Sequence, residues 1–450
     1  MSRSLTSPLL GNLAVPLETE PVRTGVGQAV RVELGKLLAQ LPVRAVAAVC
    51  LLGPFAFAAV LRIQSAIPAD TLFGRWVHQS GFALPLVVLG FAGSWGFPVL
   101  AGLVAGDVFA GEDRHDTWKT LLTRSCDRRS IFVGKTLAAA ACAVGIVTML
   151  ALSSLAAGVL TVGAQSLVGL SGTLLPPGHS LGLVLLSWLV SLVPVLGFVA
   201  LAILLSVTTR SSVMGVLGPV VVGVGMQLLA LVGRGDIVRT LLLASAFDAW
   251  HGLFVAHPFH RPLERGLAVS IGYIVACLGV TWIVLLRRDF AGPEAGGSRS
   301  GWVVPARALA IGAAVLALLA FASNWGPKGV TAGRLETSIS ATFSNLAVYQ
   351  QQLEGHRLPA GASLYVLPSC KRRGVSTPYS GQGDDWHCTL SVVGHQAQQM
   401  PIGFDVNVRA NGCYTAEGPP SVIGPATIRR RGHGFVPNPL FVFDGCFDTS

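Results

Sequence analysis

Long apolar runs separated by short polar stretches dominate the first two thirds of the chain. Each run holds about 20 apolar residues, the length that an α-helix needs to cross the hydrocarbon core of a membrane. No Asp, Glu, Lys or Arg lies in the central part of any of these runs. The pattern predicts six membrane-spanning helices, at about residues 43–63, 81–105, 136–162, 181–206, 212–232 and 266–286.

Two different segments precede the first span. Residues 1–25 are polar and interrupted by proline, which predicts a disordered cytoplasmic tail. Residues 26–42 place Leu34 and Leu37 on one helical face and Glu33 and Lys36 on the other. This amphipathic pattern predicts an interfacial helix along the inner leaflet, with a plain juxtamembrane helix as the alternative.

Residues 106–135 form the most highly charged stretch between two spans. Short loops that flank spans and carry an excess of Lys and Arg face the cytoplasm. Trp118, Leu121 and Leu122, and later Ile131 and Phe132, recur at near-helical spacing, so the loop is predicted to form two short amphipathic helices. The basic residues of the loop are Arg114, Lys119, Arg124, Arg128, Arg129 and Lys135.

The order of residues in this loop resembles the cytoplasmic loop of ABC-2 type exporter permeases. That loop runs Glu, Gly-Thr, Leu-Leu, Pro-Val-Ser-Arg and Gly-Lys at similar spacing. This chain has Asp116 in place of the first Gly, and Ser125, Cys126 and Asp127 in place of Pro-Val-Ser. The matching residues are Glu112, Thr117, Leu121, Leu122, Arg128, Arg129, Gly134 and Lys135.

The resemblance, which covers about residues 26–286, implies a permease core of six spans. In that family a coupling helix in this loop docks in a cleft of a separate ATPase subunit, and two permease copies or two homologous permeases form a dimer. The resemblance also implies that Glu112 meets a cation. An ordinary loop that obeys the positive-inside rule is the alternative. The residues expected to couple to the ATPase are Glu112, Thr117, Trp118, Leu121, Leu122, Arg128, Arg129 and Lys135.

The amino-acid composition indicates a membrane protein, and the sequence argues against nucleic-acid binding and enzyme activity. Of the 450 residues, 52% are hydrophobic and only 12% are charged, which is too apolar for an average soluble protein. The net charge of +10 comes from basic residues near the ends of the apolar runs, where they meet lipid head groups rather than nucleic acid. No Walker motif or catalytic motif is present, so we expect no enzyme activity and no bound cofactor, with ATP on the partner subunit.

The connection between the fifth and sixth spans, residues 233–265, mixes aromatic residues with scattered charges. It predicts short helices at the outer surface, partly sunk into the outer leaflet, and ABC-2 permeases carry re-entrant helices at this point. His251, His257 and His260 lie at intervals that suit interfacial histidines better than a metal site, so no metal is expected.

After the sixth span, residues 287–301 are rich in Gly, Ser and basic residues and predict a flexible cytoplasmic linker. Trp302 and Trp325 bracket a further apolar run, and a helix of this length would place one tryptophan at each interface. Residues 302–325 therefore predict a seventh span. It would place residues 326–450 outside the cytoplasm.

The last 125 residues are predicted to form a small β-rich domain. Short alternating runs at residues 363–367, 389–393, 404–408 and 440–443 are typical of strands. Four cysteines in an outer domain imply two disulfides, with three possible pairings. Proximity in sequence favours Cys370 with Cys388 and Cys413 with Cys446. The segment from Gly383 to Cys388 resembles small extracytoplasmic domains of actinobacterial envelope proteins, from which no function follows.

Together these patterns predict an α-helical polytopic protein of the plasma membrane with a disulfide-bonded outer domain and a cytoplasmic N-terminus. The expected function is that of the permease subunit of an ATP-driven ABC-2 type exporter. The alternative is a membrane-anchored envelope sensor or assembly protein whose outer domain binds a ligand. A carrier with its own ion coupling is disfavoured because the predicted spans lack central ionisable residues.

Overall fold

The computed structural model describes residues 25–449, apart from residues 65–70, 116, 119–126, 233–240, 289–328, 357–358, 360–361, 394–398 and 431–433. Several predictions fall outside these described residues. They are the N-terminal tail up to residue 24, Leu121, Leu122, Cys126, most of the linker, and the seventh span at residues 302–325.

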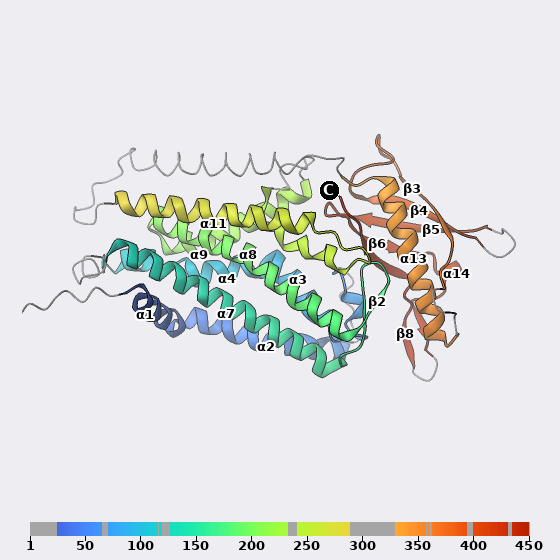
Figure 1. Ribbon diagram of the computed structural model, residues 1–450, viewed down its shortest axis with the longest axis horizontal. Helices are drawn as coiled ribbons and strands as arrows, with labels where there is room; N and C mark the ends of the chain where they lie inside the picture. The colour runs from blue at the N-terminus through green and yellow to red at the C-terminus, as the bar shows by residue number, and fades with distance from the viewer. Residues whose placement is uncertain are drawn as a thin grey trace, which may run out of the picture.

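Six helices within the described residues are long and apolar enough to cross a membrane, and they coincide with the six predicted runs. They lie side by side along the long axis of the molecule (Figure 1). The second is divided into α3, a π-helical turn η2 and α4. The bounds are α2 (Leu41–Gln64), α3 (Ala83–Phe91), η2 (Ala92–Gly96), α4 (Phe97–Ala105), α7 (Arg128–Val162), α8 (Pro177–Thr209), α9 (Ser212–Val232) and α11 (Arg261–Arg287).

The predicted helix before the first span is present as α1 (Val26–Ala39). The described part of the loop at residues 106–135 contains the short helix α5 (Ala110–Arg114), and most of the first predicted helix, around Leu121 and Leu122, lies outside the described residues. The second predicted helix is present as the first turns of α7 and is not separate from the span. No proline interrupts residues 128–135, so the span helix extends beyond the apolar run without a break.

Helices α4 and α9 touch backbone to backbone. A Cβ atom added at Gly215 would overlap the carbonyl of Gly106, and one added at Gly102 would overlap the carbonyl of Val216. Small residues at such a crossing let membrane helices approach closely and gain van der Waals contact. These glycines therefore set the distance between the second and fifth apolar helices.

At the end of the bundle opposite α1, the connections between helices are packed rather than loose. They contain η1 (Gly74–Trp76), the short strands β1 (Leu167–Val168) and β2 (Leu174–Leu175), and the 3-10 helix η3 (Leu243–Phe254). Helix η3 is one short helix of the connection predicted at the outer surface, and it packs against the long helices. Phe247 packs on Phe97 and Phe198, at centroid distances of 5.3 and 6.0 Å.

The histidines of this connection are also arranged differently from the prediction. His251 is buried beside Trp250, at a ring distance of 4.1 Å, instead of lying at an interface. His257 and His260 are exposed. Among the described residues, no group of three His, Cys, Asp or Glu side chains could hold a metal ion.

The C-terminal domain lies at the η3 end of the bundle, with a long helix, α13 (Ala332–Glu354), running across it (Figure 1). The four predicted strands overlap β3, β4, β5 and β9, and the sheet also contains β6, which was not predicted. The strand order of this sheet is β3-β4-β5-β6-β9, with each neighbouring pair antiparallel. The bounds are β3 (Val366–Arg372), β4 (Gly383–Val393), β5 (Gln399–Val408), β6 (Cys413–Glu417), α14 (Pro420–Ile423), β7 (Thr427–Arg429), β8 (Phe435–Pro437) and β9 (Val442–Cys446).

Helix α13 covers one face of this sheet and closes the core of the domain. Phe343 meets Phe404 edge to face at 5.7 Å, and the Tyr414 hydroxyl bonds with Ser338 and Thr342. Helix α13 was not predicted, although Leu335, Ile339 and Leu346 follow helical spacing. Its many Ser, Thr and Gln residues made it resemble the polar segments around it.

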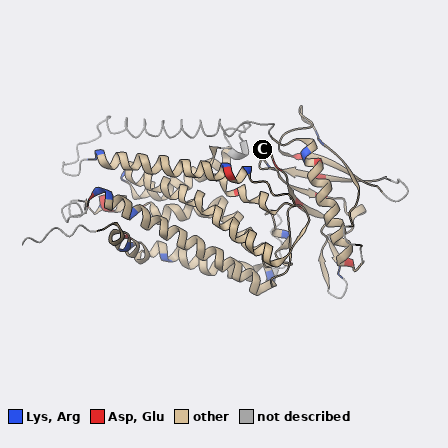
Figure 2. Ribbon diagram, in the orientation of Figure 1, with Lys and Arg blue, Asp and Glu red and all other residues tan. Residues whose placement is uncertain are grey.

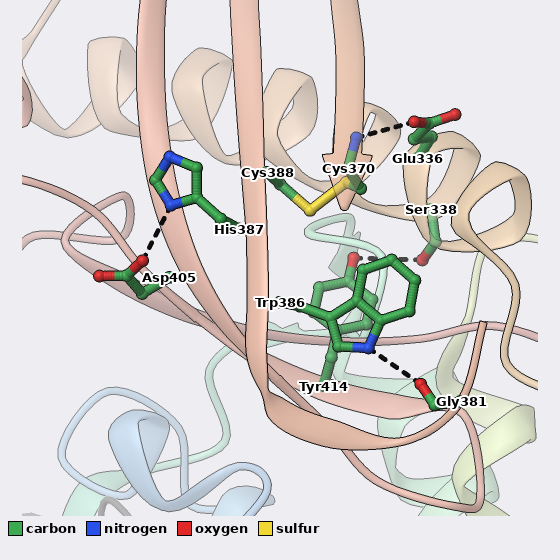
Figure 3. The surroundings of a disulfide bond; sticks show 9 residues. All are labelled: Glu336, Ser338, Cys370, Gly381, Trp386, His387, Cys388, Asp405 and Tyr414. Atoms are coloured by element: carbon green, nitrogen blue, oxygen red, sulfur yellow. Dashed lines mark hydrogen bonds and ion pairs between the residues drawn. A yellow bond between two sulfur atoms is a disulfide. The ribbon is translucent and has the colours of Figure 1, made fainter. Parts of the chain in front are cut away.

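The two disulfides are Cys370–Cys388 and Cys413–Cys446, the pairing favoured by sequence proximity. Each joins residues that face each other directly across neighbouring strands. Figure 3 shows the first disulfide beside Trp386, whose indole N–H donates to the Gly381 carbonyl at 2.9 Å. The disulfides therefore fix the register at both edges of the sheet.

The edge strand β3 is protected on its free side from Pro368 to Arg372. The backbone N–H of Cys370 donates to Glu336 of α13 at 2.7 Å, as Figure 3 shows. The backbone N–H of Arg372 donates to the Pro378 carbonyl at 2.7 Å. Alternate residues of a strand direct their N–H groups to the same side. Residue 368 has this orientation too, and as a proline it has no N–H.

We expect all four of these cysteines to be oxidised in protein extracted from the membrane. In SDS, where burial no longer protects a thiol, iodoacetamide should leave them unmodified until a reductant is added. Peptide mass spectrometry measures this directly. Cys50, Cys142 and Cys277, which are free, serve as internal positive controls because they should be alkylated without reduction. Alkylation of Cys370 or Cys413 before reduction would contradict the pairing.

Candidate functional site

The candidate site lies at the end of the bundle where α1, α5 and the start of α7 meet. Lys, Arg, Asp and Glu gather here and at the opposite end, while the long helices between are almost free of them (Figure 2). Helix α5 is held by its neighbours: Phe109 and Ala110 are fully buried, and the Ala110 N–H donates to Ser206 of α8 at 3.0 Å. This anchoring fixes where the Glu112 side chain lies.

Lys135 is the centre of the site, and its side chain is only 2% exposed. Its Nζ lies 2.9 Å from Glu33 Oε2, 2.8 Å from Glu112 Oε1 and 3.0 Å from the Val108 carbonyl. An ammonium group has three N–H donors, so all of them are satisfied. We call Glu33, Lys36, Glu112, Thr117 and Lys135 the Lys135 cluster.

The Gly134-Lys135 pair has a local structural reason. A Cβ at position 134 would collide with the Cβ of Ala29, so glycine lets α1 lie directly against α7. This close approach brings Glu33 of α1 within reach of Lys135 on α7. The glycine therefore sets the distance between the helices, and the lysine provides the charge that joins them.

Glu112 is ionised within the cluster. Burial by itself would raise the pKa of its carboxyl, but the Lys135 ammonium, the Thr117 hydroxyl and Lys36 outweigh burial and lower the pKa to about 2. Because this folded-state pKa lies below the ordinary value of 4.5, the stabilisation is complete above that pH and is lost as the pH falls toward 2. The Glu112 carboxyl is therefore ionised at neutral pH.

A second group of charges ties the same loop to α11. Arg288 forms an ion pair with Asp113 of α5, and its guanidinium lies 5.8 Å from the centre of the Trp118 ring. Arg128 donates to the carbonyls of Leu286 and Arg288, at 3.1 and 3.2 Å. These carbonyls end α11, where a positive charge is favourable because of the helix dipole.

A third link reaches α9. Asp107 accepts a hydrogen bond from the Ser212 hydroxyl at the start of α9 and forms an ion pair with Arg114 at 3.1 Å. The segment from Asp107 to Thr117 thus contacts α1, α7, α9 and α11 through charged or polar side chains. A displacement of this segment would act on several long helices at once.

The structure brings together three of the predicted coupling residues, Glu112, Thr117 and Lys135. Glu112, for which the resemblance implied a cation, forms ion pairs with Lys135 and Lys36 of the same chain. Arg128 binds the end of α11 and Arg129 is exposed, while Leu121 and Leu122 lie outside the described residues.

Trp118 was predicted to belong to a docking surface, but it is buried within this chain. Its side chain is only 5% exposed and stacks on Phe109 at 6.3 Å, because Phe109 and Arg288 enclose it within this chain. The sequence reasoning also missed Glu33, Asp107, Asp113 and Arg288 as parts of the site. A signal existed for Glu33, which is the one acidic residue on the polar face of α1.

Comparison with known protein families gives a match to a family of unknown function. A family described as "Protein of unknown function (DUF2705)" matches residues 75–291, which run from η1 to just beyond α11. No curated protein matches the chain. The matched region contains Glu112 and Lys135 but not Glu33 of α1.

Proposed function

We propose that this chain is the transmembrane permease subunit of an ATP-driven exporter of the ABC-2 type. It would form the translocation path with a second permease copy or a homologous permease, and a separate ATPase subunit would bind and hydrolyse ATP. The proposal rests on the resemblance of the loop at residues 106–135. It is supported by six long apolar helices and by the position of that loop between the second and third of them.

The Lys135 cluster is the observation that carries the proposal. A subunit driven by an external ATPase needs a rigid connection between its docking loop and its spans. Here a buried lysine joins the loop residue Glu112 to α7 and, through Glu33, to α1. A fully satisfied, buried ion pair of this kind resists separation, because breaking it would leave an uncompensated charge.

In this proposal the end that carries α1 and α5 faces the cytoplasm, and the C-terminal domain lies outside. The basic residues of the loop agree with the positive-inside rule. The two disulfides agree with an oxidising compartment for the domain. With an even number of spans up to α11, a seventh span at residues 302–325 would carry the chain outward again.

The test is recovery of an ATPase subunit by the purified permease. We expect Leu121→Asp combined with Leu122→Asp to abolish recovery of the co-expressed ATPase, because a few buried aliphatic residues dominate such interfaces, at about 1–4 kcal/mol each. Trp118 is left unchanged because its replacement would disturb contacts within this chain. Recovery is measured by pull-down and the fold by size-exclusion chromatography.

Leu9 and Leu10 provide a matched control, since they are also an adjacent pair of leucines but lie far from the loop in sequence. Their replacement by Asp should leave ATPase recovery unchanged. Recovery at the parental level with the Leu121 and Leu122 variant would refute the docking role of this loop.

A further inference from the structure

The C-terminal domain contacts two of the three connections at its end of the bundle directly and the third through one of them. Asn345 of α13 donates to the Ser171 carbonyl, between β1 and β2, at 2.8 Å. Tyr349, one helical turn further along α13, bonds with Gln79 at 3.4 Å. The third connection, η3, is reached through the β1–β2 connection.

Ser171 joins this connection to η3. The Ala256 N–H, just after η3, donates to the Ser171 hydroxyl at 3.0 Å, and the Leu170 N–H donates to the Phe254 carbonyl at 2.8 Å. Ser171 is itself only 6% exposed, since α13 lies over it. The domain therefore covers the contact between β1–β2 and η3.

An ion pair links the sheet itself to the bundle. Arg75 of η1 lies 3.5 Å from Asp444 of β9, whose side chain is only 2% exposed. Thr415 donates to the other carboxylate oxygen of Asp444 at 2.7 Å. Among the described residues, Arg75 Nε and the facing Asp444 Oδ2 have no hydrogen bond. The pair is buried but poorly satisfied.

Glu112 of the Lys135 cluster and Asp444 of β9 differ in the direction in which the pKa of the carboxyl is shifted. For Glu112, the neighbouring cations outweigh burial and the pKa falls. For Asp444, burial outweighs Arg75, Thr415 and Arg409, and the pKa rises. Burial of Asp444 thus outweighs its partners, whereas the partners of Glu112 together outweigh its burial. The distance between Arg75 and Asp444 is also longer, at 3.5 Å against 2.8 and 2.9 Å for the ion pairs of Lys135, so this pair is the weaker of the two connections.

We propose that the C-terminal domain is a cap latched onto this end of the bundle by Arg75 and Asp444, and that opening the latch uncovers the β1–β2 connection and η3 while the domain itself stays folded. The inference depends on contacts within this chain and not on the proposed transport function. It assigns the domain a conformational role, that of closing one end of the helix bundle.

The test measures the reactivity of a cysteine placed under the cap. In the purified full-length protein carrying Ser171→Cys, N-ethylmaleimide should react slowly at position 171. Adding Arg75→Gln should speed this reaction at least about tenfold, because it removes the cation nearest to the buried Asp444 carboxylate. Peptide mass spectrometry follows the label at position 171 separately from the native cysteines.

Asp385→Asn is the matched control, since Asp385 pairs with Arg372 at 2.8 Å within the domain and away from the bundle. It should leave the labelling rate unchanged. Resistance of the C-terminal domain to limited proteolysis should be the same in every variant, which reports that the domain remains folded. Equal labelling rates in the parent and Arg75→Gln proteins would overturn the latch. An equal increase with Asp385→Asn would overturn it as well, because it would indicate general loosening of the domain.

Discussion

Replacing Lys135 with methionine should lower the free energy of unfolding by about 3–5 kcal/mol, the usual result of removing one partner from a buried ion pair. Methionine keeps the length of the side chain but leaves Glu33 and Glu112 facing each other with only the half-exposed Lys36 to compensate their charge. Their repulsion should separate α1 and the α5 loop from α7. The measurement is a denaturant titration of the purified protein in mixed micelles, followed by tryptophan fluorescence.

Lys36 provides the control because it bonds with the same two carboxylates, at 2.9 Å from Glu33 and 3.5 Å from Glu112, from a half-exposed position. Lys36→Met should cost less than about 1 kcal/mol, since water replaces most of its interaction. Combining Lys135→Met with Glu33→Gln and Glu112→Gln should recover part of the loss. Equal effects of the two lysine variants would show that burial of Lys135 has no energetic role.

A single methyl group at Gly215 should separate α9 from α4. The Cβ of Gly215→Ala would overlap the Gly106 carbonyl, so one backbone has to shift. Overpacking of this kind typically costs about 1–3 kcal/mol, and a contact between two backbones leaves no flexible side chain to relieve it. We expect a value at the upper end, measured by the same titration.

Gly225 lies in the same helix and serves as the comparison, because no described atom outside its own stretch of helix lies within 4 Å of a Cβ at that position. Gly225→Ala should be neutral or stabilising by up to about 1 kcal/mol, the ordinary gain when alanine replaces glycine in a helix. A similar loss at both positions would indicate that helix flexibility, and not the close contact with α4, explains the effect at Gly215.

The long helices were predictable from sequence because their signal is local. Each apolar run carries its own length and hydrophobicity, and the ends of α2, α9 and α11 lie within a few residues of the predicted ones. The disulfide pairing was also predictable, since Cys370 and Cys388 are close in the chain, as are Cys413 and Cys446.

The remaining features depend on contacts between distant segments. Glu33 and Lys135 are 102 residues apart, and only the packing of α1 on α7 brings them together. The burial of η3 also depends on distant segments. Phe247 lies in a segment whose composition is typical of a membrane interface, but its contacts with Phe97 and Phe198 make it part of the core. A pattern along one segment carries no information about which other segment covers it.

The protected edge of β3 has a consequence for crowding at the membrane. A sheet with an open edge can add a strand from a neighbouring copy, and membrane proteins are concentrated in two dimensions. In this domain Glu336 occupies the Cys370 N–H, the Pro378 carbonyl occupies the Arg372 N–H, and Pro368 offers none. A neighbouring copy of the chain would therefore find no free backbone N–H between Pro368 and Arg372 on this side of β3 to which it could add a strand.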